Sequence, residues 1–155
     1  MYSREEKKKI KESFWTSLGQ YLSLIPISEG TKVNWINYRT GLKYLKFRMD
    51  VNDLSGIITI EISHPEKDIR MQILEQLQEY ALLLETEVGE KWTWDDEFMD
   101  EFGRPTIRIY TEISPVNILN KDDWPKLISF FKPRIIGLHN FWSSAHYNFE
   151  KFKYV

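Results

Sequence analysis

Two runs of alternating apolar and polar residues, joined by a short turn, constrain the fold of this 155-residue chain more than any other feature. The runs are "LKYLKFRMDV" at 42–51 and "IITIEIS" at 57–63, and the turn between them is "NDLSG". A period of two places alternate side chains on opposite faces of a strand. Together with an aromatic run at 32–38, the two runs predict a three-stranded antiparallel meander.

Helical patterns flank the predicted strands. Ser3 followed by Glu6 matches a capping box, and apolar residues at helical spacing predict a helix over 4–24 that Pro26 and Gly30 end. The further expected elements are a helix over 65–88 capped by Ser63 or His64, a hairpin formed by 91–98 and 106–113, and a helix from 122 to near 153 that is interrupted before Pro133.

The predicted order of elements is α-βββ-α-ββ-α, which indicates an α+β fold with a mostly antiparallel sheet. Such a sheet packs one face against helices and leaves the other to solvent, so we expect a two-layer sandwich that forms a single domain over 1–155. The order resembles both the dimeric chaperone fold of secretion systems and the αβββαβ core of restriction-endonuclease-like nucleases. Topology alone does not decide between their functions.

The net charge of −2 gives no overall attraction to nucleic acid or to an anionic membrane, but the charges are unevenly distributed. Residues 32–50 hold five basic residues and one acidic residue, whereas residues 85–101 hold eight acidic residues and one lysine. The chain has no cysteine, which excludes a disulfide and a thiolate metal site. No run approaches the length of a membrane span, so we expect a cytoplasmic protein with no membrane partner.

Alternation places Tyr44, Lys46 and Arg48 on the outer face of the sheet, close in sequence to the aromatic residues Trp35 and Tyr38. An aromatic and basic sheet face is one way to hold single-stranded nucleic acid. The same composition suits a solvated face or a homodimer, in which the acidic segment meets the basic face of a second copy. The aromatic C-terminal helix offers a further docking site for another protein.

A nuclease of the restriction-endonuclease-like class needs two strand-borne acids that hold a metal ion, with a lysine two residues after the second acid. Asp50 and Glu61 are the candidate acids, but Ser63 occupies the lysine position. His64 is a candidate base, and capping is its ordinary alternative. His139 and His146 are seven residues apart, about 10.5 Å along a helix, which is too far for easy chelation. We therefore expect no metal and no cofactor, and favour a binding module over an enzyme.

Four stretches together resemble a bacterial family catalogued as domain of unknown function 4268: "FWTSLGQY" at 14–21, "KVNWINYRTGLKYLKFRMD" at 32–50, "IEISHP" at 60–65 and "DDWPKLISFFKPRIIGLHNFW" at 122–142. Members occur alone or appended to longer proteins with nuclease-like regions, so the resemblance implies a DNA-handling or defence context. It adds Arg134 to the binding candidates, and it groups Arg48, Asp50, Glu61 and His64 as a polar cluster near one end of the sheet.

The sequence thus favours a binding or interaction module that forms a homodimer or binds another protein, with nucleic acid as a further candidate partner. Two alternatives stay open. One is a divergent metal-dependent nuclease that uses Asp50 and Glu61, and the other is a homodimeric chaperone-like domain that binds proteins.

Overall fold

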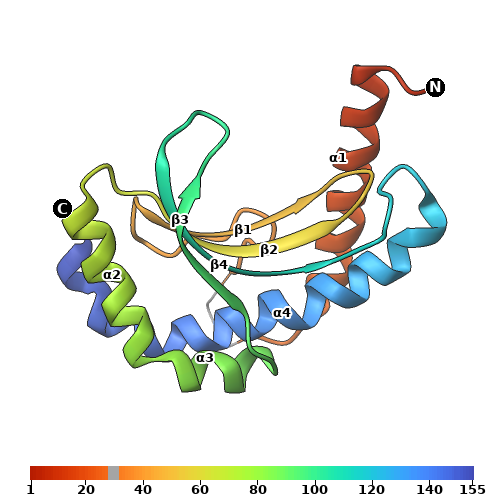
Figure 1. The fold of residues 1–155 in the computed structure, drawn as a ribbon. Coiled ribbons are helices and arrows are strands. Elements are labelled where there is room, and N and C mark those ends of the chain that lie inside the picture. The colour runs from red at the N-terminus through yellow and green to blue at the C-terminus, as the bar shows by residue number, and fades with distance from the viewer. Residues whose placement is uncertain (28–31) are drawn as a thin grey trace.

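The computed structural model describes residues 1–27 and 32–155 and confirms the predicted α+β class (Figure 1). The expected helix end at Gly30 lies outside the described residues. In chain order the elements are α1 (Arg4–Leu22), β1 (Leu45–Val51), β2 (Gly56–Ile62), α2 (Lys67–Glu79), α3 (Ala81–Val88), β3 (Thr93–Met99), β4 (Pro105–Ile113), the 3₁₀ helix η1 (Lys121–Asp123), α4 (Trp124–Ala145) and the 3₁₀ helix η2 (His146–Phe152).

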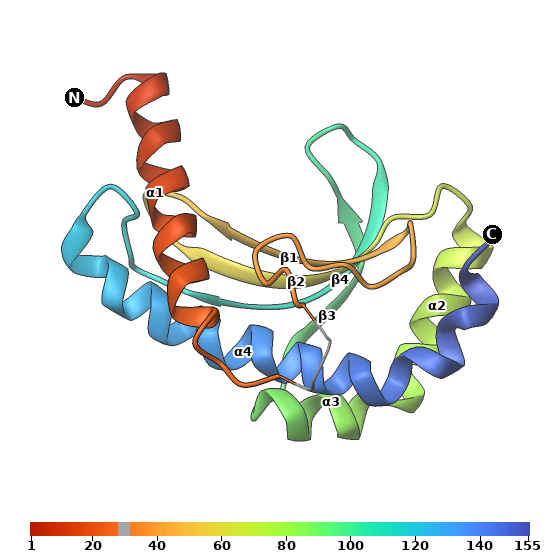
Figure 2. The same cartoon turned by 180° about the vertical axis from the view of Figure 1, so that it is seen from behind.

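The four strands form one antiparallel sheet in the order β1-β2-β4-β3. The predicted alternation is confirmed in β1, where Leu45, Phe47 and Val51 are buried while Lys46 and Arg48 are exposed. Helix α4 runs along the inner face of the sheet, and α1 packs across one end (Figures 1 and 2). Within the described residues no helix covers the opposite face, which we call the outer face.

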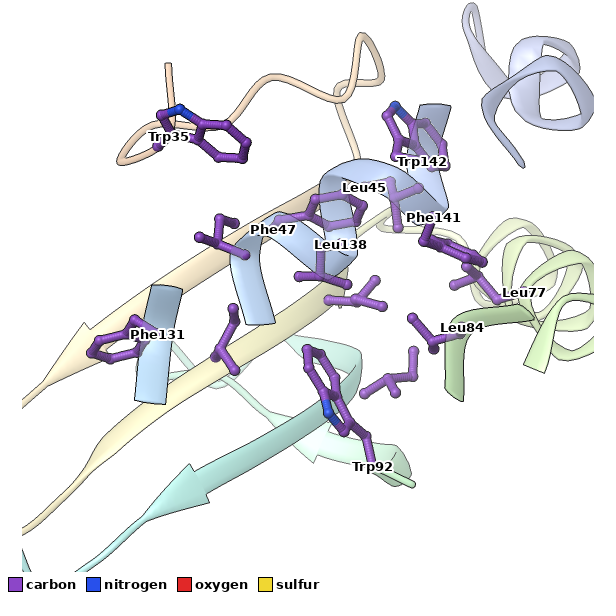
Figure 3. Close-up of a cluster of buried hydrophobic side chains, with 14 of the residues drawn as sticks. Trp35, Leu45, Phe47, Leu77, Leu84, Trp92, Phe131, Leu138, Phe141 and Trp142 are labelled. Atoms are coloured by element: carbon purple, nitrogen blue, oxygen red, sulfur yellow. The ribbon is translucent and has the colours of Figure 1, made fainter. Parts of the chain in front are cut away.

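The core lies between the inner face of the sheet and α4 (Figure 3). Phe131, Leu138 and Phe141 project from α4 toward the strands, where Leu45 and Phe47 meet them. Leu77 of α2 and Leu84 of α3 close the other side of the same cluster. Helix α4 therefore contributes more buried hydrophobic side chains to the core than any other described helix.

The strand predicted at 32–38 does not form, so the sheet that the described residues build has four strands rather than five. The segment is irregular, and Asn34 Oδ1 accepts a hydrogen bond from the Asn37 amide at 3.0 Å within a tight turn. Its aromatic residues pack against α4 and the sheet: Trp35 is 7% exposed, and Tyr38 stacks on Phe47 with ring centroids 5.2 Å apart. The aromatic content reflected burial of side chains rather than strand pairing, and β1 is left as an edge of the sheet.

The helix predicted over 65–88 divides at Tyr80 into α2 and α3, although no glycine or proline marks the division. The Tyr80 ring packs near Phe141 and Phe149, while its backbone leaves the helical conformation at ψ 13°. Tertiary packing thus redirects the chain where the local sequence favours a continuous helix. At the start of α2, His64 Nδ1 accepts the Glu66 amide at 3.0 Å, so His64 has a capping contact as expected, although Glu66 is the N-cap residue.

The predicted interruption before Pro133 is wrong, because α4 continues through it. Proline removes a backbone donor from a helix and normally breaks or kinks it. Here the buried side chains of Phe130, Phe131 and Ile135 fix the helix on both sides of the proline. Arg134 Nη1 also donates to the Phe130 carbonyl at 2.9 Å. In residues 1–27 and 32–155, no helix combines the length and apolar character needed to cross a membrane.

Candidate functional site

A row of four charged side chains of alternating sign crosses the outer face of the sheet. The strand register places Lys46 of β1 opposite Glu61 of β2, Glu61 opposite Arg108 of β4, and Arg108 opposite Asp95 of β3. We call these four residues the charge row. Because neighbouring members have opposite charges, the row stabilises the sheet as a set of cross-strand pairs.

Within the charge row, Arg108 is enclosed by aromatic side chains. Its guanidinium lies between two rings, 3.8 Å from the Phe98 centroid and 4.1 Å from the Tyr110 centroid. Its Nε stands 3.6 Å from Asp95 Oδ2, beyond hydrogen-bond distance, and this buried nitrogen has no hydrogen-bond partner in the described part of the chain. The two rings hold the Arg108 guanidinium in position, and its Nε–H group makes no hydrogen bond to a described residue.

The β3–β4 hairpin rises over the same face and bounds a groove of about 470 Å³, which we call the outer groove (Figure 1). The groove lies between the tip, residues 98–104, and the side chains of Tyr44, Lys46 and Arg48. Asp100 fixes the tip, because its Oδ1 accepts the Phe102 and Arg104 amides, both at 2.9 Å. The hydrogen bond from the Arg104 amide lowers the pKa of the Asp100 carboxyl, and Phe102 beside it is exposed.

The two predicted nuclease acids line the outer groove but lie far apart. Asp50 pairs with Ile57, whereas Glu61 is four residues further along β2, a separation of about 13 Å along the strand. Glu61 Oε2 instead lies 3.6 Å from Arg48 Nη1. Asp50 Oδ1 accepts a hydrogen bond from the backbone amide of its neighbour Val51. In the described ranges no three His, Asp or Glu side chains gather closely enough to hold a metal ion.

His64, the candidate base, is 6% exposed and has structural contacts on both sides. Its ring packs edge-on against Tyr44 at 4.4 Å, and its carbonyl accepts Arg70 Nη1 at 2.8 Å. With the Glu66 amide on Nδ1, these contacts hold His64 at the junction of β2 and α2.

The remaining predicted binding residues lie away from the outer groove. Trp35 packs edge-on against His139 of α4 at 5.2 Å, and the Tyr38 hydroxyl shares a 2.7 Å hydrogen bond with His139 Nδ1. Arg134 pairs with both carboxylate oxygens of Glu90, at 2.7 and 3.1 Å. The structure thus brings Tyr44, Lys46 and Arg48 together in the outer groove, and Tyr38 lines a second hollow on the other side of Lys46 and Arg48. Trp35 and Arg134 lie in contacts that join loops to α4.

We expect Tyr38→Phe to lower the free energy of unfolding by about 1–2 kcal/mol, because it leaves His139 Nδ1 without its partner. Burial raises the pKa of Tyr38 to about 12 from 10.0, so the unfolded chain ionises first and stability is lost as the pH rises through that interval. Tyr38→Phe removes this alkaline loss. Urea unfolding at about pH 8 and about pH 11 measures both effects. Tyr21→Phe, at an exposed position, is the control, and an equal response in both variants would contradict the assignment.

Burial also lowers the pKa of His139 from its ordinary 6.5. The folded state therefore holds the neutral ring, and the unfolded state takes up the proton first as the pH falls. This stabilisation is present above pH 6.5 and is lost as the pH falls through the lower folded pKa. The Tyr38–His139 contact is accordingly a structural pair that is most stable near neutral pH.

Several groove residues were missing from the sequence-based prediction. Arg108 lines the groove and Tyr110 packs beside it; both alternate with buried isoleucines in "TIRIYTEI", so the period of two in β4 already contained the signal for their outward direction. Phe98 and Phe102 had no such signal. They reach the groove because the hairpin bends over the sheet at an irregularity between Asp95 and Phe98.

The comparisons with known proteins give one result. A family model with the description "Domain of unknown function (DUF4268)" matches residues 10–146. No curated protein and no solved structure matches the chain.

Proposed function

From the premise that the chain belongs to the DUF4268 family, whose description assigns no activity, we propose that it is an interaction module that pairs with a second copy through its outer face. The observation that carries this proposal is the charge row. A metal-dependent nuclease is not proposed, since Asp50 and Glu61 lie too far apart along the strands to share an ion.

The charge row has the order positive, negative, positive, negative. When a second copy of the row is turned end to end and laid over the first, every charge faces one of opposite sign. If two outer faces meet about a two-fold axis parallel to the strands, the order of the row is inverted in the second copy. Lys46 then faces Asp95 of the second copy, and Glu61 faces its Arg108. An isologous interface forms each contact twice, and complementary charges fix the orientation of the two copies.

The hairpin supports the same arrangement. Its tip bears Asp100 and Glu101, and it rises at the end of the sheet where β1 carries Lys46 and the preceding loop carries Lys43. A two-fold axis parallel to the strands puts both hairpins at the same end of the dimer, at opposite edges of the two facing sheets. Each acidic tip then reaches toward the basic edge strand of the other copy, with exposed Phe102 available as an apolar anchor.

The ion pairs that the charge row makes within one chain are loose, so its charged groups can also form contacts between chains. Within one chain, Arg48 to Glu61 and Arg108 to Asp95 are both 3.6 Å, longer than a charge-assisted hydrogen bond. The Arg48 side chain is 61% exposed, so that pair is weak in water. Excluding water between two such faces would strengthen each charge interaction.

Charge reversal tests the proposal. Lys46→Glu and Asp95→Lys, made singly, each place like charges opposite one another twice, and we expect the dimer Kd to rise about 100-fold, equivalent to about 2.7 kcal/mol. The double variant restores opposite charges between copies, although inside each chain it leaves Glu61 and Arg108 beside like charges. Sedimentation equilibrium of the three variants measures the Kd.

Recovery of the dimer in the double variant supports contact between chains, because residues 46 and 95 lie three strands apart in one chain, about 14 Å. Lys153→Glu, an exposed lysine outside the sheet, is the control for the change in net charge and should leave the Kd unchanged. A monomeric wild-type protein, or a double variant as weak as the single ones, contradicts the proposal.

A further inference from the structure

One stripe of α1 changes from apolar to basic along its length. Positions 4, 7, 11, 14, 18 and 22 follow one another at helical spacing and therefore lie on the same side of the helix. The last three are Phe14, Leu18 and Leu22, which are fully buried against the body of the protein. The first three are basic, and Lys8 extends them, so the basic stripe consists of Arg4, Lys7, Lys8 and Lys11.

The half of α1 that carries the basic stripe overhangs the protein. Figures 1 and 2 show the N-terminal half of α1 rising above one end of the sheet, on the side opposite α4. Every residue from Arg4 to Lys9 is exposed. The helix thus continues for nearly three turns on the N-terminal side of Phe14, with basic side chains in place of the buried ones.

The basic stripe faces a cleft of about 420 Å³, whose opposite wall is formed by Asn52, Asp53, Ile118 and Leu119. This wall is fixed by hydrogen bonds between the β1–β2 turn and the segment after β4. The Val116 amide donates to the Leu54 carbonyl at 3.0 Å, and the Ile118 amide donates to the Asn52 carbonyl at 3.1 Å. The cleft is therefore preformed, with four cations on one side and one carboxylate on the other.

The cations have no anionic partners within the structure described. The ion pairs found in residues 1–27 and 32–155 include none of the four basic side chains. Like charges at neighbouring positions of one helix destabilise it. A basic stripe directed at a preformed cleft therefore favours an anion that enters from outside.

We propose that this cleft binds the phosphate backbone of duplex DNA. From Arg4 to Lys11 the stripe rises about 10.5 Å, longer than one phosphate group requires and suited to consecutive phosphates of a strand. Among the described residues no aromatic side chain lines the cleft, so bases have no ring there on which to stack, and the contacts are to the backbone without sequence preference. A membrane surface is not favoured, because Ile10 is the single apolar side chain between Arg4 and Lys11.

Fluorescence anisotropy of a labelled duplex, titrated with the full chain at several salt concentrations, tests the proposal. If each of the four basic side chains contacts one phosphate, the logarithm of the association constant should fall with the logarithm of the salt concentration with a slope of about −3.6 for each bound stripe. In Lys7→Gln/Lys11→Gln the slope should fall to about −1.8, with affinity at least about tenfold weaker. Both positions are partly or fully exposed, and circular dichroism verifies that the variant folds.

The matched control is Lys9→Gln/Lys153→Gln, which removes the same charge from the opposite side of α1 and from beyond η2. It should keep the slope and the affinity of the wild type. An equal loss in both pairs, or a flat salt response, overturns the proposal. Binding to poly-L-glutamate without binding to the duplex overturns it in favour of an acidic protein partner.

This site is independent of the proposed dimer. Lys46→Glu leaves the basic stripe intact, so it should retain the salt slope of one stripe even where it is monomeric. The duplex and sedimentation experiments can therefore fail separately, and each failure identifies which surface was assigned incorrectly.

Discussion

Gly137→Ala is expected to lower the free energy of unfolding by about 3 kcal/mol, which corresponds to a fall in Tm of about 10 °C. A Cβ at position 137 would lie 2.5 Å from the Glu87 carbonyl oxygen and 3.0 Å from Val88 Cα. These are backbone atoms of α3, which cannot rotate away as a side chain can. The substitution would force α3 and α4 apart, and thermal and urea unfolding measure the result.

Gly19→Ala is the matched control for Gly137→Ala, because both glycines lie inside helices. At position 19 a Cβ would meet only Ile36 Cγ1, at an ordinary contact distance of 3.6 Å. Alanine has the higher helix propensity, so this change should be neutral or stabilise by up to about 1 kcal/mol. Equal stability of the two variants would show that α3 and α4 do not approach each other as described.

Phe131→Ala should lower the free energy of unfolding by about 3–5 kcal/mol, the largest single effect that we expect. The side chain is fully buried, and its ring lies 5.2 Å from Phe130, 5.6 Å from Trp15 and 6.2 Å from Phe14. The change removes these contacts and leaves a cavity where α1, α4 and the sheet meet. Denaturant unfolding monitored by tryptophan fluorescence measures the loss.

Phe102→Ala is the control for Phe131→Ala, since it removes the same side chain from a position that is 72% exposed. Its effect on unfolding of the isolated chain should stay within about 0.5 kcal/mol. A small effect of Phe131→Ala, comparable to that of Phe102→Ala, would contradict the central place of α4 in the core.

The parts of the fold that local periodicity determines were predictable from the sequence. The inward and outward residues of β1 and β2 follow from a period of two, which depends on strand geometry alone. The helix that begins at Arg4 follows from its capping box, in which the Ser3 hydroxyl accepts the Glu6 amide at 3.1 Å. These signals are local, so no knowledge of the rest of the chain is required.

The parts that depend on tertiary contacts were not predictable. Trp35 and Tyr38 have high strand propensity, yet their rings pack edge-on against His139 of α4 in place of a strand partner. Pro133 has a strong local tendency to interrupt a helix, and the buried aromatic residues around it override that tendency. At Tyr80 the packing of two helices against different neighbours redirects the chain without any local breaker.

In the candidate site, too, local periodicity predicted some features, and tertiary structure determined the others. The sequence identified Tyr44, Lys46 and Arg48 as neighbours on the outer face, and the structure places them along one groove. The distance between Asp50 and Glu61 depends on strand register, which a one-residue difference in a turn would change. The approach of the hairpin tip to the sheet depends on a bulge, which no sequence motif marked.

The position of α4 in the chain affects how the protein folds during synthesis. Strands β1 to β4 precede α4, which supplies the main cover for the fully buried isoleucines of β2, namely Ile58, Ile60 and Ile62. Chains emerge from the ribosome N-terminus first, so the sheet residues are available well before residues 124–145. Until then its inner face lacks its main apolar partner. Burial of the inner face is therefore a late event in co-translational folding, and before that point the nascent chain exposes the apolar side chains of the strands.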